Sequence, residues 1–167
     1  AFLIILACSA YGQDNRTSET KVADALALFP ARTNEDADRL FRELINLDDA
    51  GLDLVTKGVV PNGNPEGVAY RYAVSLLTHH ASSKEQKQRI ERAYLRAIEK
   101  SDNTEVKSYF IDNLKVIGSA QSVKPLAGLI GVEGLSDQAI GALVSIGGDD
   151  ASAALKSALE RNDNTKA

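Results

Sequence analysis

Two adjacent histidines, His79 and His80, are the first residues to examine for chemistry, because imidazole binds metals and titrates near neutral pH. Neighbouring residues of a helix point about 100° apart, so this pair cannot hold one metal ion as histidines four positions apart do. Both lie at the predicted end of a helix, where an imidazolium ion is stabilised by the helix dipole. We therefore interpret them as helix-end residues.

Two pairs of neighbouring carboxylates could serve as an acid and a base, Asp48-Asp49 and Asp149-Asp150. A glycosidase needs two carboxyl groups that face one cleft, one of them with a raised pKa. Each pair, however, directly precedes a predicted helix, where carboxylates cap free amides and meet the positive end of the dipole. Capping explains both pairs without catalysis.

The segment 83–100 is rich in basic residues, with six basic against three acidic side chains. Two interpretations stay open for it: a stripe that binds an acidic protein segment or a phosphate, or a solvated helix face shared with Glu91 and Glu99. Because no aromatic residue interleaves the row, stacking on nucleic-acid bases has no support. The candidate partner-binding stripe follows a spacing of four residues and consists of Lys84, Gln88, Arg92, Arg96 and Lys100.

No further motif points to catalysis, and the sequence predicts no catalytic, cofactor-binding or metal site. Gly147-Gly148 lacks the additional glycines and the lysine of a phosphate-binding loop. The net charge of −4, from 19 basic and 23 acidic residues, offers no general attraction to nucleic acid or to an anionic membrane. We expect a binding protein without a cofactor rather than an enzyme.

The elements that position these residues are predicted to be helices throughout. Apolar residues recur at helical spacing, and no stretch alternates with the period of a strand. The apolar stripes include Val68, Tyr72, Ile140 and Leu159, and capping boxes are predicted at Ser82 with Glu85 and at Asp102 with Glu105. The expected helices span 21–29, 34–47, 49–59, 66–80, 83–100, 104–117, 120–130, 135–146 and 150–160.

An internal repeat organises these helices. A shift of 29 residues sets Ile117-Gly118 on Ile146-Gly147 and Leu126 on Leu155, and a shift of 38 sets Leu76 on Leu114. A helical hairpin cannot bury its apolar stripe alone, so neighbouring hairpins must stack. The sequence therefore predicts an all-α fold, an α-solenoid of about four antiparallel helical hairpins.

The N-terminal segment AFLIILACSAYGQ, residues 1–13, is uncharged and apolar. It is too short for a membrane span, which needs ~20 residues, and it is typical of a truncated signal sequence. Two processing routes stay open: cleavage before Gln13, or a lipoprotein signal that leaves a lipidated Cys8. We expect export to the periplasm, the outer membrane or the exterior, with membrane attachment only if Cys8 is lipidated.

The segment EVKSYFIDNLKVIGSAQSVKPLAGLI resembles a HEAT or HEAT-like repeat, with Pro125 near the start of the second helix. Together with KVADALALFPA and GLDLVTKGVVPNGNPEGVAYRYAVSLL, it is similar to the N-terminal HEAT-repeat region of exported proteins of Bacteroidetes-type bacteria. In that family the repeats often precede a 3-keto-disaccharide hydrolase domain. The resemblance implies that any hydrolase activity would belong to a domain outside this chain.

The predicted organisation is a signal at 1–13, a linker at 14–20, a HEAT-like repeat domain at 21–161 and a polar tail at 162–167 that could lead to a further domain. The predicted function is a non-catalytic interaction or scaffold module whose partner is a protein or an enzyme domain in the same chain. The alternatives are a lyase-type enzyme, since HEAT-like repeats occur in bilin lyases, and a stand-alone lipoprotein adaptor.

Overall fold

The computed structural model describes residues 14–164, and every regular element in that range is a helix. The described helices are α1 (Ser18–Leu26), α2 (Asn34–Ile45), α3 (Asp49–Lys57), a short 3-10 helix η1 (Pro65–Gly67), α4 (Val68–His80), α5 (Lys84–Lys100), α6 (Thr104–Ile117), α7 (Ala120–Ala127), α8 (Ser136–Ile146) and α9 (Gly148–Asn164). The prediction of an all-α fold is confirmed.

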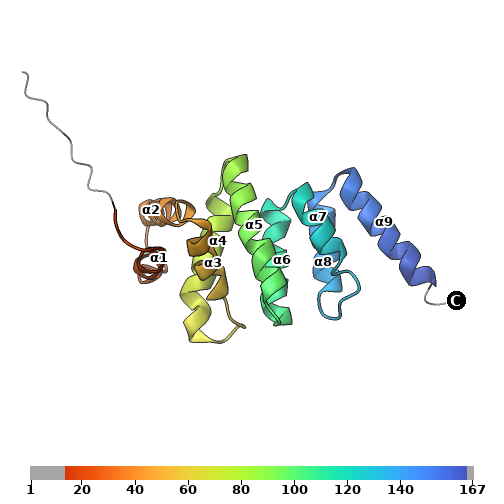
Figure 1. The fold of residues 1–167 in the computed structure, drawn as a ribbon, viewed down its shortest axis with the longest axis horizontal. Helices are drawn as coiled ribbons and strands as arrows, with labels where there is room; N and C mark the ends of the chain where they lie inside the picture. The colour runs from red at the N-terminus through yellow and green to blue at the C-terminus, as the bar shows by residue number, and fades with distance from the viewer. Residues whose placement is uncertain (1–13, 165–167) are drawn as a thin grey trace, which may run out of the picture.

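The helices form an elongated two-layer stack (Figure 1). Odd-numbered helices contact one another in order, α1 with α3, α3 with α5, α5 with α7 and α7 with α9. Even-numbered helices do the same from α2 to α8, and each odd-numbered helix from α1 to α7 also contacts the even-numbered helix that follows it. This succession is what stacked helical hairpins produce, because each hairpin can cover its apolar stripe only with its neighbours.

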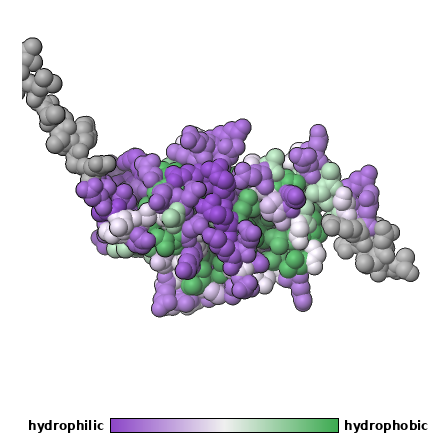
Figure 2. Space-filling view, in the orientation of Figure 1, coloured by the Kyte–Doolittle hydropathy of each residue, from purple (hydrophilic) through white to green (hydrophobic). Residues whose placement is uncertain are grey.

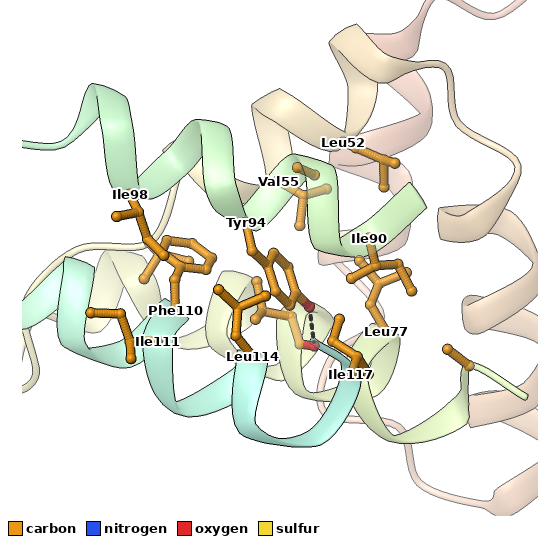
Figure 3. Close-up of a cluster of buried hydrophobic side chains, with 14 of the residues drawn as sticks. Leu52, Val55, Leu77, Ile90, Tyr94, Ile98, Phe110, Ile111, Leu114 and Ile117 are labelled. Atoms are coloured by element: carbon orange, nitrogen blue, oxygen red, sulfur yellow. Dashed lines mark hydrogen bonds between the residues drawn. The ribbon is translucent and has the colours of Figure 1, made fainter. Parts of the chain in front are cut away.

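The core lies between the two layers and is densest around α5 and α6 (Figure 3). Tyr94 and Phe110 are fully buried there, with ring centroids 5.3 Å apart in a tilted arrangement that aromatic rings favour. Leu114 and Ile111 of α6 are also completely buried. The large side chains of this region fix α4, α5 and α6 in one packing unit.

A buried polar network joins the same three helices. The side-chain nitrogen of Asn113 donates a hydrogen bond to the Tyr109 carbonyl at 2.8 Å. The side-chain oxygen of Asn113 therefore faces Thr78 and accepts a hydrogen bond from its hydroxyl at 2.7 Å. The Tyr94 hydroxyl, 2.9 Å from Thr78, then donates to the carbonyl oxygen of Val74 at 2.9 Å. The hydroxyl groups of Thr78 and Tyr94 and the side-chain oxygen of Asn113 all have partners, so the network fixes the register of the helices at little desolvation cost.

Several predicted boundaries need correction. Helix α1 begins at Ser18, inside the predicted linker 14–20, because Thr17 caps it by accepting from the Thr20 amide. Helix α9 continues to Asn164, into the predicted tail 162–167. Capping boxes predicted at Ser82 and Asp102 are wrong by one residue, since Ser83 with Gln86 forms the first box and Asn103 caps α6 through the Val106 amide.

Pro125 does not lie in the first turn as predicted. It is the sixth residue of α7, where its missing amide removes an intrahelical hydrogen bond, and the helix ends two residues later at Ala127. The two Ile-Gly stops also differ in backbone conformation. Gly147 has a φ of 67°, whereas Gly118 is extended. A Cβ on Gly118 would clash with the Leu114 carbonyl oxygen and lie 2.9 Å from Ile146 Cδ1. Gly118 is therefore required for close packing rather than for a left-handed turn.

Four of the residues assigned to apolar stripes lie at the surface instead. Val68 and Tyr72 of α4 are 49% and 47% exposed, and Ile140 and Leu159 are 37% and 67% exposed. Tyr72 stacks on Phe29 from the segment that follows α1, with ring centroids 6.4 Å apart. In each of these helices the buried stripe is narrower than the hydrophobic pattern suggests.

Candidate functional site

The predicted stripe lies on α5, where Figure 2 shows a continuous polar surface across the middle of the molecule. Lys84 and Arg92 are exposed and Gln88 is half-buried, and none of the three makes a hydrogen bond or ion pair with another described residue. Their spacing of four residues sets them along one side of the helix. The N-terminal three residues of the stripe are thus available to a ligand.

The other two stripe residues, Arg96 and Lys100, converge on Asp53 of α3. Arg96 Nε donates to Asp53 Oδ1 at 2.8 Å, and Lys100 Nζ donates to Asp53 Oδ2 at 2.8 Å. Burial alone would raise the pKa of Asp53, but the hydrogen bonds from Arg96 and Lys100 outweigh it and lower the pKa below its usual value. One carboxylate is shared by two cations, so the cluster keeps a net positive charge.

The cluster forms part of the rim of a cleft of about 590 Å³ between α3 and α5. The floor of this α3–α5 cleft reaches α6 and is apolar: Leu54, Val59, Ala97, Val106 and Phe110. Its rim carries three basic and two acidic side chains: Lys57, Arg96, Lys100, Glu19 and Asp53. An apolar floor beneath a few charged groups is the usual composition of a ligand site.

Arg96 has unused hydrogen-bonding capacity in this cleft. Its Nε donates to Asp53 Oδ1, and its Nη2 lies 2.7 Å from the same oxygen as an ion pair that is shielded from solvent. Nη1 makes no hydrogen bond with another described residue. A guanidinium group offers five N–H donors, so Arg96 can bind an additional acceptor.

A second groove, of about 570 Å³, lies on the opposite layer between α4 and α6. Arg71 crosses it, packed 4.4 Å above the centroid of the Tyr109 ring and bonded to the Val60 carbonyl at 2.7 Å. Asn113 at its base belongs to the buried polar network. Because these polar groups already bind neighbouring residues of the chain, this groove offers fewer open donors than the α3–α5 cleft.

The structural role of Glu91 does not follow from the sequence. The sequence places Glu91 on the solvated face of the helix, yet its side chain is completely buried. Its carboxylate accepts from the Ser119 amide at 2.8 Å and from the Ser122 hydroxyl at 2.5 Å. The Ser119 hydroxyl donates to the same carboxylate and lies 2.8 Å from Oε2 and 3.0 Å from Oε1. Glu91 therefore binds the N-terminus of α7, where the helix dipole also favours a negative charge.

The histidines and the acidic pairs have separate surroundings. His80 lies 3.4 Å from Asp38 and against the Phe41 ring, whereas His79 lines the α4–α6 groove. Asp48 caps α3 through the Gly51 amide at 2.8 Å and accepts from Ser18, and both bonds lower its pKa. Asp149 and Asp150 lie in the first turn of α9.

Within residues 14–164 no three His, Cys, Asp or Glu side chains are grouped so that they could hold a metal ion. None of the helices in that range is both long and apolar enough to span a membrane. The predicted lipidation site, Cys8, and the predicted signal at 1–13 lie outside the described residues. The structure thus leaves the α5 stripe and the adjoining cleft as the candidate site.

Comparison of the chain with protein-family models, with curated proteins and with solved structures found no match.

Proposed function

We propose that this chain is a non-catalytic helical-repeat interaction module that binds an acidic segment of a protein partner along α5. The observation that carries the proposal is the row of Lys84, Gln88 and Arg92, which has no partner in the described chain and leads to the α3–α5 cleft. Cations on one rigid helix attract an acidic segment and fix its direction.

The resemblance to HEAT-like repeats belongs to this proposal. It is supported by the contacts of odd-numbered with odd-numbered and of even-numbered with even-numbered helices. Export stays a prediction based on residues 1–13. In an exported protein the module would act as a scaffold or as the accessory region of an enzyme domain, which would carry any catalysis.

A charge-reversal experiment tests the proposal. The triple variant Lys84→Glu, Arg92→Glu, Lys100→Glu is compared with Lys107→Glu, Lys124→Glu, Lys156→Glu, which changes the net charge equally on other helices. The probe is a fluorescein-labelled polyglutamate peptide with an amidated end, measured by fluorescence anisotropy. We expect the stripe variant to weaken binding by about tenfold or more and the control variant by no more than about twofold, because only the stripe contacts the peptide. Equal losses in both variants would refute the stripe.

A further inference from the structure

The α3–α5 cleft combines two kinds of surface that a uniformly acidic segment would not use together. Leu54 and Ala97 are half-buried, so they offer an apolar wall to a ligand. The buried side chains of Val106 and Phe110 close the base of the cleft. The rim directly above carries Arg96, Lys100 and Lys57. A ligand that fills the cleft must therefore place an apolar group and an acceptor group within a short distance of each other.

The net charge of the rim favours an acceptor group that is negatively charged. Lys57, Arg96 and Lys100 face Glu19 and Asp53, which leaves an excess of one positive charge. Asp53 already accepts from both Arg96 and Lys100, so this one carboxylate leaves part of the positive charge of the rim unbalanced. An incoming carboxylate would balance the excess charge.

We infer that the α3–α5 cleft binds the C-terminus of a partner polypeptide that ends in a large apolar residue. A terminal residue carries a carboxylate and an apolar side chain on the same Cα, which matches the closeness of rim and floor. The cleft of about 590 Å³ falls in the range of ~300–1,000 Å³ for pockets that enclose small ligands, so it takes a chain end rather than a long segment.

This inference rests on the proposed function, because it names the end of the partner whose acidic segment would follow α5. In this arrangement the terminal carboxylate binds Arg96 and Lys100, and the terminal side chain lies on Leu54 and Ala97. The residues that precede the terminus then run along α5 towards Arg92 and Lys84.

Three fluorescently labelled hexapeptides test the terminal carboxylate and the apolar terminal side chain separately. Their first five residues are glycine and serine in each case. One ends in phenylalanine with a free carboxylate, one ends in phenylalanine amide, and one ends in glycine with a free carboxylate. We expect the first to bind about tenfold more tightly than either of the others, because only it offers both groups. Equal binding of the amide would overturn the inference, since the terminal carboxylate would then not be recognised.

Two variants of the protein locate the site. Ala97→Phe fills the cleft without changing charge, and its matched control is Ala153→Phe on the exposed side of α9. Lys100→Gln, at a side chain that is 66% exposed, removes one rim charge without a risk to folding. We expect Ala97→Phe and Lys100→Gln each to weaken binding of the phenylalanine peptide by about fivefold or more, and Ala153→Phe to leave it unchanged. If neither cleft variant weakens binding, the peptide lies elsewhere and the inference fails.

The outcomes also separate this inference from the proposed function. If polyglutamate amide binds in a stripe-dependent manner and the phenylalanine peptide does not bind, the stripe stands and the cleft assignment fails. If neither peptide binds, both fail together.

Discussion

The central helices α3–α6 and the C-terminal helices α7–α9 are stacked in the same way but packed by different means. The centre buries Tyr94 and Phe110 and adds the hydrogen-bonded network around Thr78. The C-terminal part contains no aromatic residue and buries leucines such as Leu126 and Leu143 beside small residues such as Ala139. Apolar burial contributes about 25 cal/mol per Å², so we expect the larger buried side chains of the centre to contribute more stability.

The difference shows that the repeat pattern determines where helices lie but does not fix how firmly each is held. Ile130 is 8% exposed, whereas its counterpart Leu159, 29 residues later, is 67% exposed. Glu91 links the two parts in the odd-numbered layer, because it binds the N-terminus of α7 from α5, while α6 contacts α8 in the even-numbered layer. We expect the C-terminal helices to open locally before the centre, as happens in stacked repeats.

The largest expected effect comes from a charge in the central core. Leu114→Asp should lower the free energy of unfolding by about 4 kcal/mol or more, because it buries an unpaired carboxylate at a fully buried position. Its control, Leu159→Asp in the C-terminal part, should stay within about 0.5 kcal/mol. Urea titrations followed by circular dichroism measure both, and similar effects at the two sites would erase the contrast between the regions.

Removal of the Glu91 carboxylate should have the next largest effect on stability. Glu91→Ala leaves the Ser119 amide and the Ser119 and Ser122 hydroxyls without their acceptor, which should cost about 3 kcal/mol. Glu99→Ala, on an exposed residue of the same helix, is the matched control. Thermal unfolding of the two variants gives the comparison, and a Glu91 variant as stable as the control would show that α7 is held by other contacts.

We expect a smaller loss of stability when one hydrogen bond of the buried polar network is removed. Tyr94→Phe keeps the ring packing and removes one hydroxyl, so it should destabilise the protein by about 1 kcal/mol. Tyr72→Phe, at a half-exposed ring on the same side of the core as α6, should have no measurable effect. Chemical denaturation of both proteins resolves this difference, and an unchanged Tyr94 variant would mean that the network adds no stability to the centre.

The smallest effect concerns the ion pairs of the cleft and depends on pH. Because the pKa of Asp53 is lowered in the folded state, its contribution is complete above the unfolded pKa and is lost as the pH falls through the folded pKa. Asp53→Asn should therefore cost less than about 1 kcal/mol at about pH 7, as is usual for partly exposed pairs, and less than that at about pH 3. Thermal unfolding at both pH values checks this, and a difference that grows towards low pH would have the wrong sign.

The sequence predicts the helices well where one boundary signal dominates. Gly118 and Gly147 are such signals, and α6 and α8 end at Ile117 and Ile146, as predicted. Where two neighbours can cap equally, as at Ser82-Ser83 or Asp102-Asn103, the sequence cannot choose, because the packing of the apolar stripe decides which residue becomes the cap. The exposure of Val68 and Leu159 does not follow from the sequence, because an apolar stripe on a helix does not show whether a neighbouring helix covers it.

The candidate site was only half predictable. The spacing of Lys84, Gln88 and Arg92 places them on one side of α5, and this follows from helical periodicity. The partnership of Asp53 with Arg96 and Lys100 joins residues 43 and 47 positions apart, which periodicity cannot reveal. Glu91 resembles any other surface glutamate of a helix until Ser119 and Ser122 are seen beside it.

Hydrogen–deuterium exchange of backbone amides tests the contrast between the two regions most directly. The account predicts that amides of α5 and α6 exchange slowest, that amides of α8 and α9 exchange faster, and that Glu91→Ala accelerates exchange in α7–α9 while α4 keeps its protection. A single common exchange rate for all helices, or acceleration spread evenly over the chain in the Glu91 variant, would contradict it.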